Sequence, residues 1–131
     1  MTNEKGRPEG SVREDALQEK SMAFAVRIVK LAKWLREERK EYSLADQILR
    51  SGTSIGANVS EAHYASSRRD FLNKCKIALK ECAETLFWLD LFEKSDLADS
   101  RHVQSMTTDC SELRHLLSAT CKTVEKGLEA P

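Results

Sequence analysis

Only a few residues of this chain stand at a spacing that could support catalytic or metal chemistry. Glu112 and His115 form one Glu-x-x-His pair, which is half of the helical motif that di-iron bundles use twice, together with two further glutamates. The neighbouring apolar stripe places both side chains toward solvent, and His63 and His102 have no partner ligand at helical spacing. No nucleophile–base arrangement or phosphate-binding loop is present. We therefore expect no metal, no cofactor and no enzymatic activity.

Basic residues are the second candidate for chemistry, because Lys and Arg neutralise nucleic-acid phosphates. The chain is neutral overall, but residues 1–80 carry 16 Lys and Arg against 11 Asp and Glu, and residues 81–131 carry 5 against 10. A solvated surface is the competing interpretation, and only Tyr64 and Phe71 could stack on a base near residues 66–69, so we expect no sequence-specific recognition. The predicted phosphate contacts are Lys33, Arg36, Lys40, Arg50, Arg68, Arg69, Lys74 and Lys76.

A polar ridge accompanies the apolar face of residues 44–65. Its Ser, Thr and Gly residues are poor or middling helix formers, so they indicate close approach by a neighbouring helix. Such polar groups either pair inside the bundle and fix the register of its helices, or line a site at a subunit junction. The polar side chains that we expect to be buried are Ser54, Asn58, Glu61 and Glu84.

The apolar residues recur with a helical period, which predicts four long helices joined by short connections. These helices span about residues 14–39, 44–65, 68–94 and 100–126. Ser43 and Ser67 are the expected N-caps and Gly127 the expected C-cap, while Ser11 and Glu14 fit a capping box. Short connections predict an all-α, antiparallel up-down-up-down four-helix bundle over residues 14–128, preceded by a flexible arm over residues 1–13.

The 131 residues suffice for one domain with its own core. Cys75, Cys82, Cys110 and Cys121 fall on the apolar stripes of two expected helices and form no CxxC pair. Because no signal peptide or membrane-spanning run is present either, we expect a cytoplasmic protein with reduced thiols in its core and no membrane partner.

Two of the expected helices are apolar on more than one side, which a single small core does not require. The second apolar faces predict an oligomer interface. Its residues are Met22, Val26, Val29, Ile77, Trp88 and Leu91.

A long string of residues resembles the signature of the bacterial "four helix bundle protein" family. The string is Arg50-Ser-Gly-Thr-Ser-Ile-Gly-Ala-Asn58, followed by Glu61-Ala62, Asp70-Phe71, Ile77-Ala-Leu-Lys-Glu81, Glu84-Thr85 and Trp88-Leu89. That family includes proteins encoded by intervening sequences in large-subunit rRNA genes, and the chain is also similar to the accessory variability protein of diversity-generating retroelements. The resemblance covers residues 20–126 and implies a homopentamer, a barrel of five bundles around a central channel.

These observations predict a non-catalytic, oligomeric accessory protein that contacts the backbone of RNA or DNA through basic surfaces of the first three helices. The alternative is a structural or adaptor bundle that binds a protein partner, such as a reverse transcriptase. A salt-dependent mobility shift with random RNA or DNA would separate these two functions.

Overall fold

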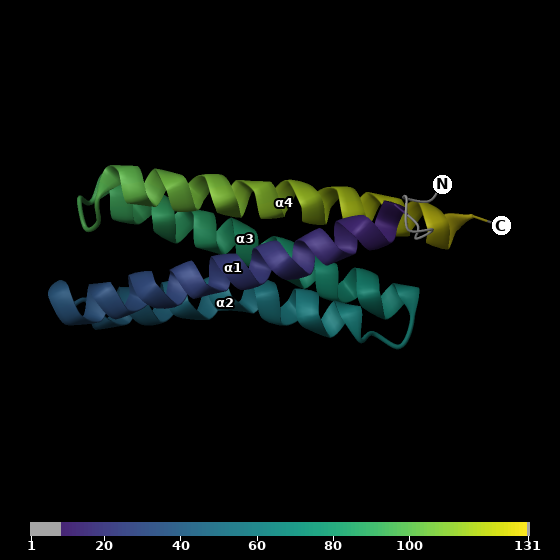
Figure 1. Cartoon of the computed structure of the whole chain (residues 1–131), viewed down its shortest axis with the longest axis horizontal. Helices are drawn as coiled ribbons and strands as arrows, with labels where there is room; N and C mark the ends of the chain where they lie inside the picture. The colour runs from purple at the N-terminus through teal and green to yellow at the C-terminus, as the bar shows by residue number, and fades with distance from the viewer. Residues whose placement is uncertain (1–8, 131) are drawn as a thin grey trace.

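The computed structural model describes residues 9–130, and all regular structure within this range is helical (Figure 1). The four helices are α1 (Glu9–Glu38), α2 (Tyr42–His63), α3 (Arg68–Lys94) and α4 (Ser100–Glu129). The predicted all-α fold class is therefore confirmed. Of the expected arm, residues 1–8 lie outside the described residues, and residues 9–13 belong to α1.

Consecutive helices run in opposite directions and pack against each other, which confirms the up-down-up-down bundle (Figure 1). α1 packs on α2, α2 on α3 and α3 on α4, and α4 returns to α1. The contact between α1 and α4 is the smallest of the four. Its polar contacts are Arg13–Thr123, Lys20–Glu112 and Arg27–Asp109, and the ribbon of α1 diverges from α4 toward the α1–α2 connection (Figure 1).

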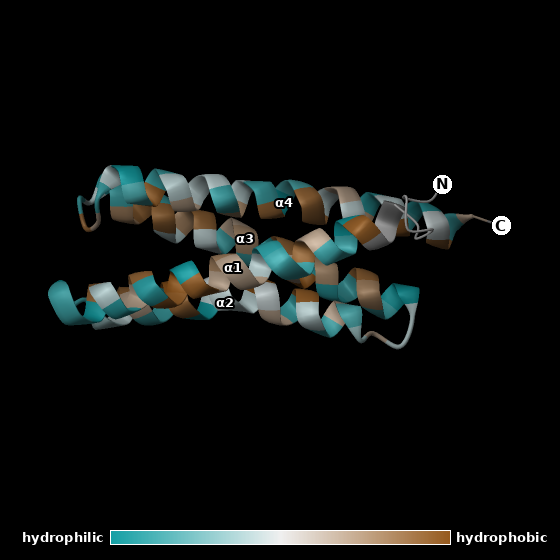
Figure 2. Cartoon of the chain, in the orientation of Figure 1, coloured by the Kyte–Doolittle hydropathy of each residue, from teal (hydrophilic) through white to brown (hydrophobic). Residues whose placement is uncertain are grey.

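The core lies on the helical stripes that the apolar spacing predicts and draws on all four helices. Hydrophobic and hydrophilic residues are interspersed along each helix (Figure 2). The largest side chains without solvent exposure include Phe24, Ile28, Ile48, Leu89 and Phe92. α4 places its whole stripe of seven residues in this core, from Val103 to Val124. Fully burying each aliphatic or aromatic side chain contributes about 1.5–3 kcal/mol, so these stripes hold the bundle together.

The close contact between α1 and α2 depends on two glycines of α2. A β-carbon at Gly52 would lie 2.6 Å from Ile28 Cδ1, and one at Gly56 would lie 3.3 Å from the backbone oxygen of Ser21. The small residues of α2 thus let the backbone of α1 approach, as the sequence predicts.

Three of the four predicted helix caps are wrong. Ser11 lies inside α1, which begins at Glu9, so the expected capping box does not start this helix. Ser67 does cap α3, since its hydroxyl accepts from the backbone N–H of Asp70 at 3.0 Å. Ser43 lies inside the first turn of α2, whose N-cap Glu41 makes no side-chain capping bond. Gly127 does not end α4, which continues to Glu129, because a glycine with open space around it can remain helical.

None of the described helices is both long and apolar enough to cross a membrane.

Candidate functional site

A polar network joins α2 to α3 on the outside of the bundle. The Arg50 guanidinium donates to Glu81 Oε2 at 3.3 Å and to Glu84 Oε2, and Trp88 Nε1 donates to the same Glu84 oxygen at 3.0 Å. The bonds from Trp88 and Arg50 lower the pKa of Glu84, and the bond to Glu84 raises the pKa of Arg50. This network fixes the register of the two helices and keeps Glu84 ionised.

Two buried hydroxyls lie in the same α2–α3 contact. Thr85 Oγ1 contacts both Ser51 Oγ at 3.0 Å and the backbone oxygen of Glu81 at 2.8 Å, and both hydroxyl residues are fully buried. Sequence reasoning missed Thr85 as a buried polar residue. Its position at i+4 from Glu81, on the apolar stripe of α3, was the available signal.

The predicted burial of the polar ridge is wrong for Glu61 and only partial for the other three residues. Glu61 is exposed in the single chain and pairs with Lys74 at 3.1 Å. Ser54 and Asn58 are half-buried, and each donates to a carbonyl one turn earlier in α2. Local bonding to their own helix satisfies these side chains, so none needs a partner across the core.

Most of the predicted phosphate contacts already have acidic partners. The pairs are Arg36–Asp46 at 2.6 Å, Arg50 with Glu81 and Glu84, Arg68–Glu14 at 3.5 Å, Lys74–Glu61 at 3.1 Å and Lys76–Glu125 at 3.3 Å. Among the described residues no acidic group pairs with Lys33, Lys40 or Arg69. A phosphate would have to compete for the paired residues, whereas it could bind the unpaired ones directly.

The predicted basic residues also lie at opposite ends of the bundle. Lys33, Arg36 and Lys40 are near the α1–α2 connection, whereas the four from Arg68 to Lys76 are near the α2–α3 connection. α2 has 22 residues, so its two ends are about 33 Å apart. One chain therefore presents two separate basic clusters.

The end of α1 carries the richer of these clusters, and we name it the basic end. It comprises Lys30, Lys33, Arg36, Arg39 and Lys40, all of which are exposed. Within the described range only Arg36 of this group has an acidic partner. The basic end is thus the stronger candidate for phosphate contacts.

An exposed apolar strip precedes the basic end on α1. Met22, Val26 and Val29 are 66%, 47% and 50% exposed, and we call these three residues the α1 strip. The predicted α3 face is less open, since Ile77 is exposed but Trp88 and Leu91 are partly buried. At 100° per residue Lys33 continues the α1 strip on the same side of the helix.

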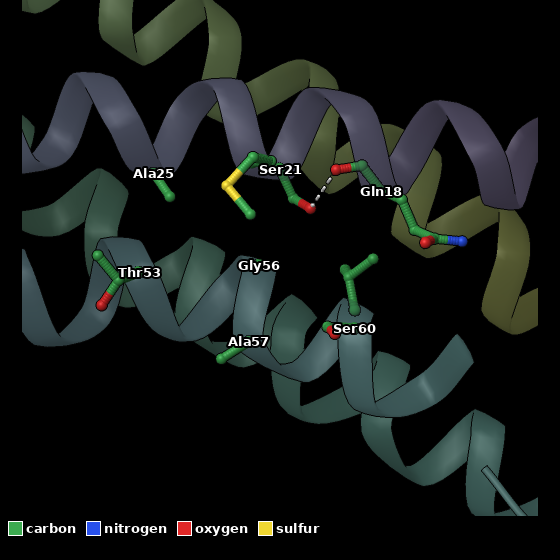
Figure 3. Close-up of a pocket in the computed structure, with 9 residues that line it drawn as sticks. Gln18, Ser21, Ala25, Thr53, Gly56, Ala57 and Ser60 are labelled. Atoms are coloured by element: carbon green, nitrogen blue, oxygen red, sulfur yellow. Dashed lines mark hydrogen bonds between the residues drawn. The ribbon is translucent and has the colours of Figure 1, made fainter. Parts of the chain in front are cut away.

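A shallow groove of about 360 Å³ lies beside the α1 strip, between α1 and α2 (Figure 3). Ser21 and Ala25 of α1 and Thr53, Gly56 and Ala57 of α2 contribute to its lining. Apart from Gln18, the labelled side chains are small, so the groove owes its shape to the close approach of the two helices (Figure 3). It offers a recess for an apolar side chain from another molecule.

A second pocket, of about 330 Å³, lies between the last third of α1 and the start of α4. Lys30, Leu31, Trp34, Asp99 and His102 line it together with Ala98. Sequence reasoning missed this pocket, although Lys30 and Trp34 stand one helical turn apart.

The side chains that could support metal or redox chemistry are ion-paired, exposed singly or buried. Glu112 pairs with Lys20 at 2.6 Å, His115 is exposed, and the described residues hold no cluster of three potential metal ligands. All four cysteines are free and buried, as predicted. Burial raises the pKa of the Cys75 thiol to about 12 and also raises that of Cys121.

A family model described as 23S rRNA-intervening sequence protein matches residues 13–119. A crystal structure of a protein with unknown function from the S23 ribosomal protein family of Bacteroides thetaiotaomicron has 46% sequence identity and a TM-score of 0.82. The similarity covers 84% of this chain and 98% of that one. No curated protein matches the chain.

Proposed function

Because the chain belongs to the 23S rRNA-intervening sequence protein family, we propose that it is a non-catalytic, self-assembling accessory protein that binds the backbone of RNA or DNA. The observation that carries this proposal is the arrangement of α1, in which an exposed apolar strip runs directly into an exposed basic end. Assembly through the strip would bring several basic ends together.

The self-assembly step rests on the α1 strip and the groove beside it. Exposure of three neighbouring apolar side chains to water is unfavourable, and burying them against a partner stabilises the assembly. The partner is a second copy of this chain, and repetition of the contact closes a ring. The family resemblance implies five copies in that ring.

The binding step rests on repetition of the basic end. In a single chain, five of the eight predicted contacts are ion-paired within the described part of the fold, and the unpaired ones are divided between the two ends of the bundle. A ring would present the basic end once per copy, and linked weak sites gain affinity through effective concentration. Contacts of this kind recognise phosphates and are sensitive to salt rather than to base sequence.

An adaptor for a protein partner, such as a reverse transcriptase, is the second candidate function. It is favoured by the same exposed α1 strip, which would then bind an apolar face of the other protein.

The test combines an assembly variant with charge reversals. Val26→Glu introduces a charge into the α1 strip, and it should lower the mass measured by light scattering while far-UV helicity stays unchanged. Lys33→Glu together with Lys40→Glu should weaken binding to mixed-sequence RNA or DNA and reduce its salt dependence by roughly one unit of slope per lost phosphate contact.

The matched control is Lys122→Glu together with Lys126→Glu, which makes the same charge change on exposed residues of α4 and should affect binding less. Arg68→Glu with Arg69→Glu tests the other end of the bundle. A parent protein that is monomeric at micromolar concentration would refute self-assembly. An intact oligomer with no mobility shift at about 50 mM salt would refute nucleic-acid binding and favour the adaptor.

A further inference from the structure

The pocket between α1 and α4 combines an apolar interior with a cationic rim. Of the apolar residues that line it, Leu31 is buried, Ala98 is half-buried and Trp34 is 39% exposed. Lys30 stands at the rim and is exposed. The volume of about 330 Å³ lies within the range of about 300–1,000 Å³ of small-molecule sites, so a single ring system fits where a helix or a duplex would not.

Neither Trp34 nor Lys30 is engaged elsewhere in the described part of the chain. The aromatic contacts there join His63 to Tyr64 and Phe87 to Trp88, and none involves Trp34. No described carboxylate pairs with Lys30. An open indole face one helical turn from a free ammonium group can accept a stacked ring and its attached anion at the same time.

The charges around the pocket indicate where the ring and the anion of such a ligand would lie. Asp99 lines the pocket, and its Oδ2 accepts from the backbone N–H of His102, which caps α4. This carboxylate disfavours a phosphate inside the pocket. Lys30 lines the pocket from α1 and Lys33 lies further along α1 in the basic end, so the neutral ring belongs within and the phosphate belongs on the side of the basic end.

We propose that this pocket binds one unstacked base of a single-stranded nucleic acid, with the base on Trp34 and the adjoining phosphate at Lys30. This inference rests on the proposed function and specifies its partner, since a duplex keeps its bases stacked and unavailable to Trp34. Base stacking on an aromatic side chain tolerates any sequence, which agrees with recognition through the backbone.

The first experiment measures the affinity of a labelled, mixed-sequence single-stranded oligonucleotide by fluorescence anisotropy. Trp34→Ala should weaken its binding about 5- to 100-fold, and Trp34→Phe, which keeps an aromatic ring, should restore most of the loss. Phe87→Ala is the matched control, because Phe87 is 59% exposed on α3, does not line this pocket and should leave affinity unchanged. Binding to a duplex of the same sequence should be equal for all four proteins.

The second experiment uses Trp88→Phe, which leaves Trp34 as the sole tryptophan. In this variant the single strand should quench tryptophan fluorescence in a saturable manner, and the duplex should not. Acrylamide should quench Trp34 in the assembled protein before the oligonucleotide is added. Protection from acrylamide at that stage would mean that another copy covers the pocket, and would overturn the inference.

The outcomes separate the inference from the function on which it rests. If no nucleic acid shifts the intact oligomer at low salt, the proposed function fails. If the oligomer binds single strands but Trp34→Ala binds as tightly as the parent and Trp34 is not quenched, the proposed function stands and the inference fails. Equal quenching by strand and duplex would also overturn it.

Discussion

Replacement of Gly52 by alanine tests the tight contact between α1 and α2. A β-carbon at this position would lie 2.6 Å from both Ile28 Cδ1 and Ile28 Cγ1, and 2.9 Å from Ile28 Cγ2. Favourable carbon–carbon contacts are about 3.5–4.0 Å long, so three contacts are too short by roughly 1 Å. Ile28 has no solvent-exposed surface, so it can move aside only by displacing other core side chains.

The net change in stability is the difference between the helix preference of alanine and the cost of crowding the core. Alanine is favoured over glycine inside a helix by about 1 kcal/mol. An extra methyl group in a packed core costs about 1–3 kcal/mol, and three simultaneous contacts place Gly52→Ala in the upper half of that range. We therefore expect a net loss of about 1–2 kcal/mol in the free energy of unfolding.

Two other helical glycines supply the controls. At Gly56 the added carbon would lie 3.3 Å from Ser21 O, so Gly56→Ala should be nearly neutral, as the mild crowding offsets the helix preference. At Gly127 nothing lies within 4 Å, so Gly127→Ala should stabilise the protein by up to about 1 kcal/mol. Urea unfolding followed by far-UV circular dichroism measures all three at one protein concentration, because self-association also shifts apparent stability.

A double-mutant cycle identifies Ile28 as the cause. Ile28→Ala removes all three atoms that the new carbon would meet and should cost about 2–5 kcal/mol on its own through the cavity that it leaves. In the double variant the alanine at position 52 fills part of that cavity, so the combined loss should be smaller than the sum by about 1 kcal/mol or more. Additive losses, or a Gly52→Ala protein as stable as Gly127→Ala, would refute the close packing of α1 on α2.

Two further predictions concern the buried polar groups and the thiols. Thr85→Val removes the bond to Ser51 and should lower the free energy of unfolding, measured in urea, by about 1–3 kcal/mol. The control Thr123→Val, on the exposed side of α4, should change it little. Equal effects would contradict the burial of the Ser51–Thr85 pair. The four cysteines should react slowly with a thiol reagent at pH 8 and together in urea, and rapid native labelling of two or more would contradict their burial. Since burial raises the pKa of Cys75 from 9.0 to about 12, its contribution to stability is present below pH 9 and is lost as the pH rises toward 12.

The fold was predictable from sequence because its signal is repeated many times. Each helix carries five or more apolar residues in one stripe, so a single misread position does not change the assignment. Helix ends depend on one or two local bonds. The N-cap at Ser67 was predicted correctly because its capping bond to Asp70 lies within one turn. The predicted end of α4 at Gly127 was wrong because a glycine permits a helix to end but does not require it.

The candidate sites were harder to predict because they depend on contacts between distant residues. Arg68 lies 54 positions from its partner Glu14, and Lys76 lies 49 positions from Glu125, so no local pattern reveals that these cations are paired. The pocket at Trp34 requires the start of α4 to face the end of α1, which follows from the topology and from the small α1–α4 contact. Net charge and spacing alone therefore reveal neither the ion pairs at the α2–α3 end nor the pocket at Trp34.

The string from Arg50 to Asn58 has a structural explanation in most of its positions. Arg50 pairs with the carboxylates of α3, Ser51 with Thr85, and Gly52 and Gly56 admit α1. Thr53, Ser54 and Asn58 bond carbonyls of their own helix, and Ile55 is in the core.

The residues that mark the family therefore hold α2 against both of its neighbours, and they leave little side-chain chemistry free for a ligand. We therefore place the proposed function on surfaces outside this string. The α1 strip, the basic end and the Trp34 pocket all involve the outward side of α1. The string contacts α1 only where α1 packs on α2. Relatives that share the α2 string but differ along α1 should thus keep the bundle and differ in what they bind, which the assembly and binding assays above can measure on each protein.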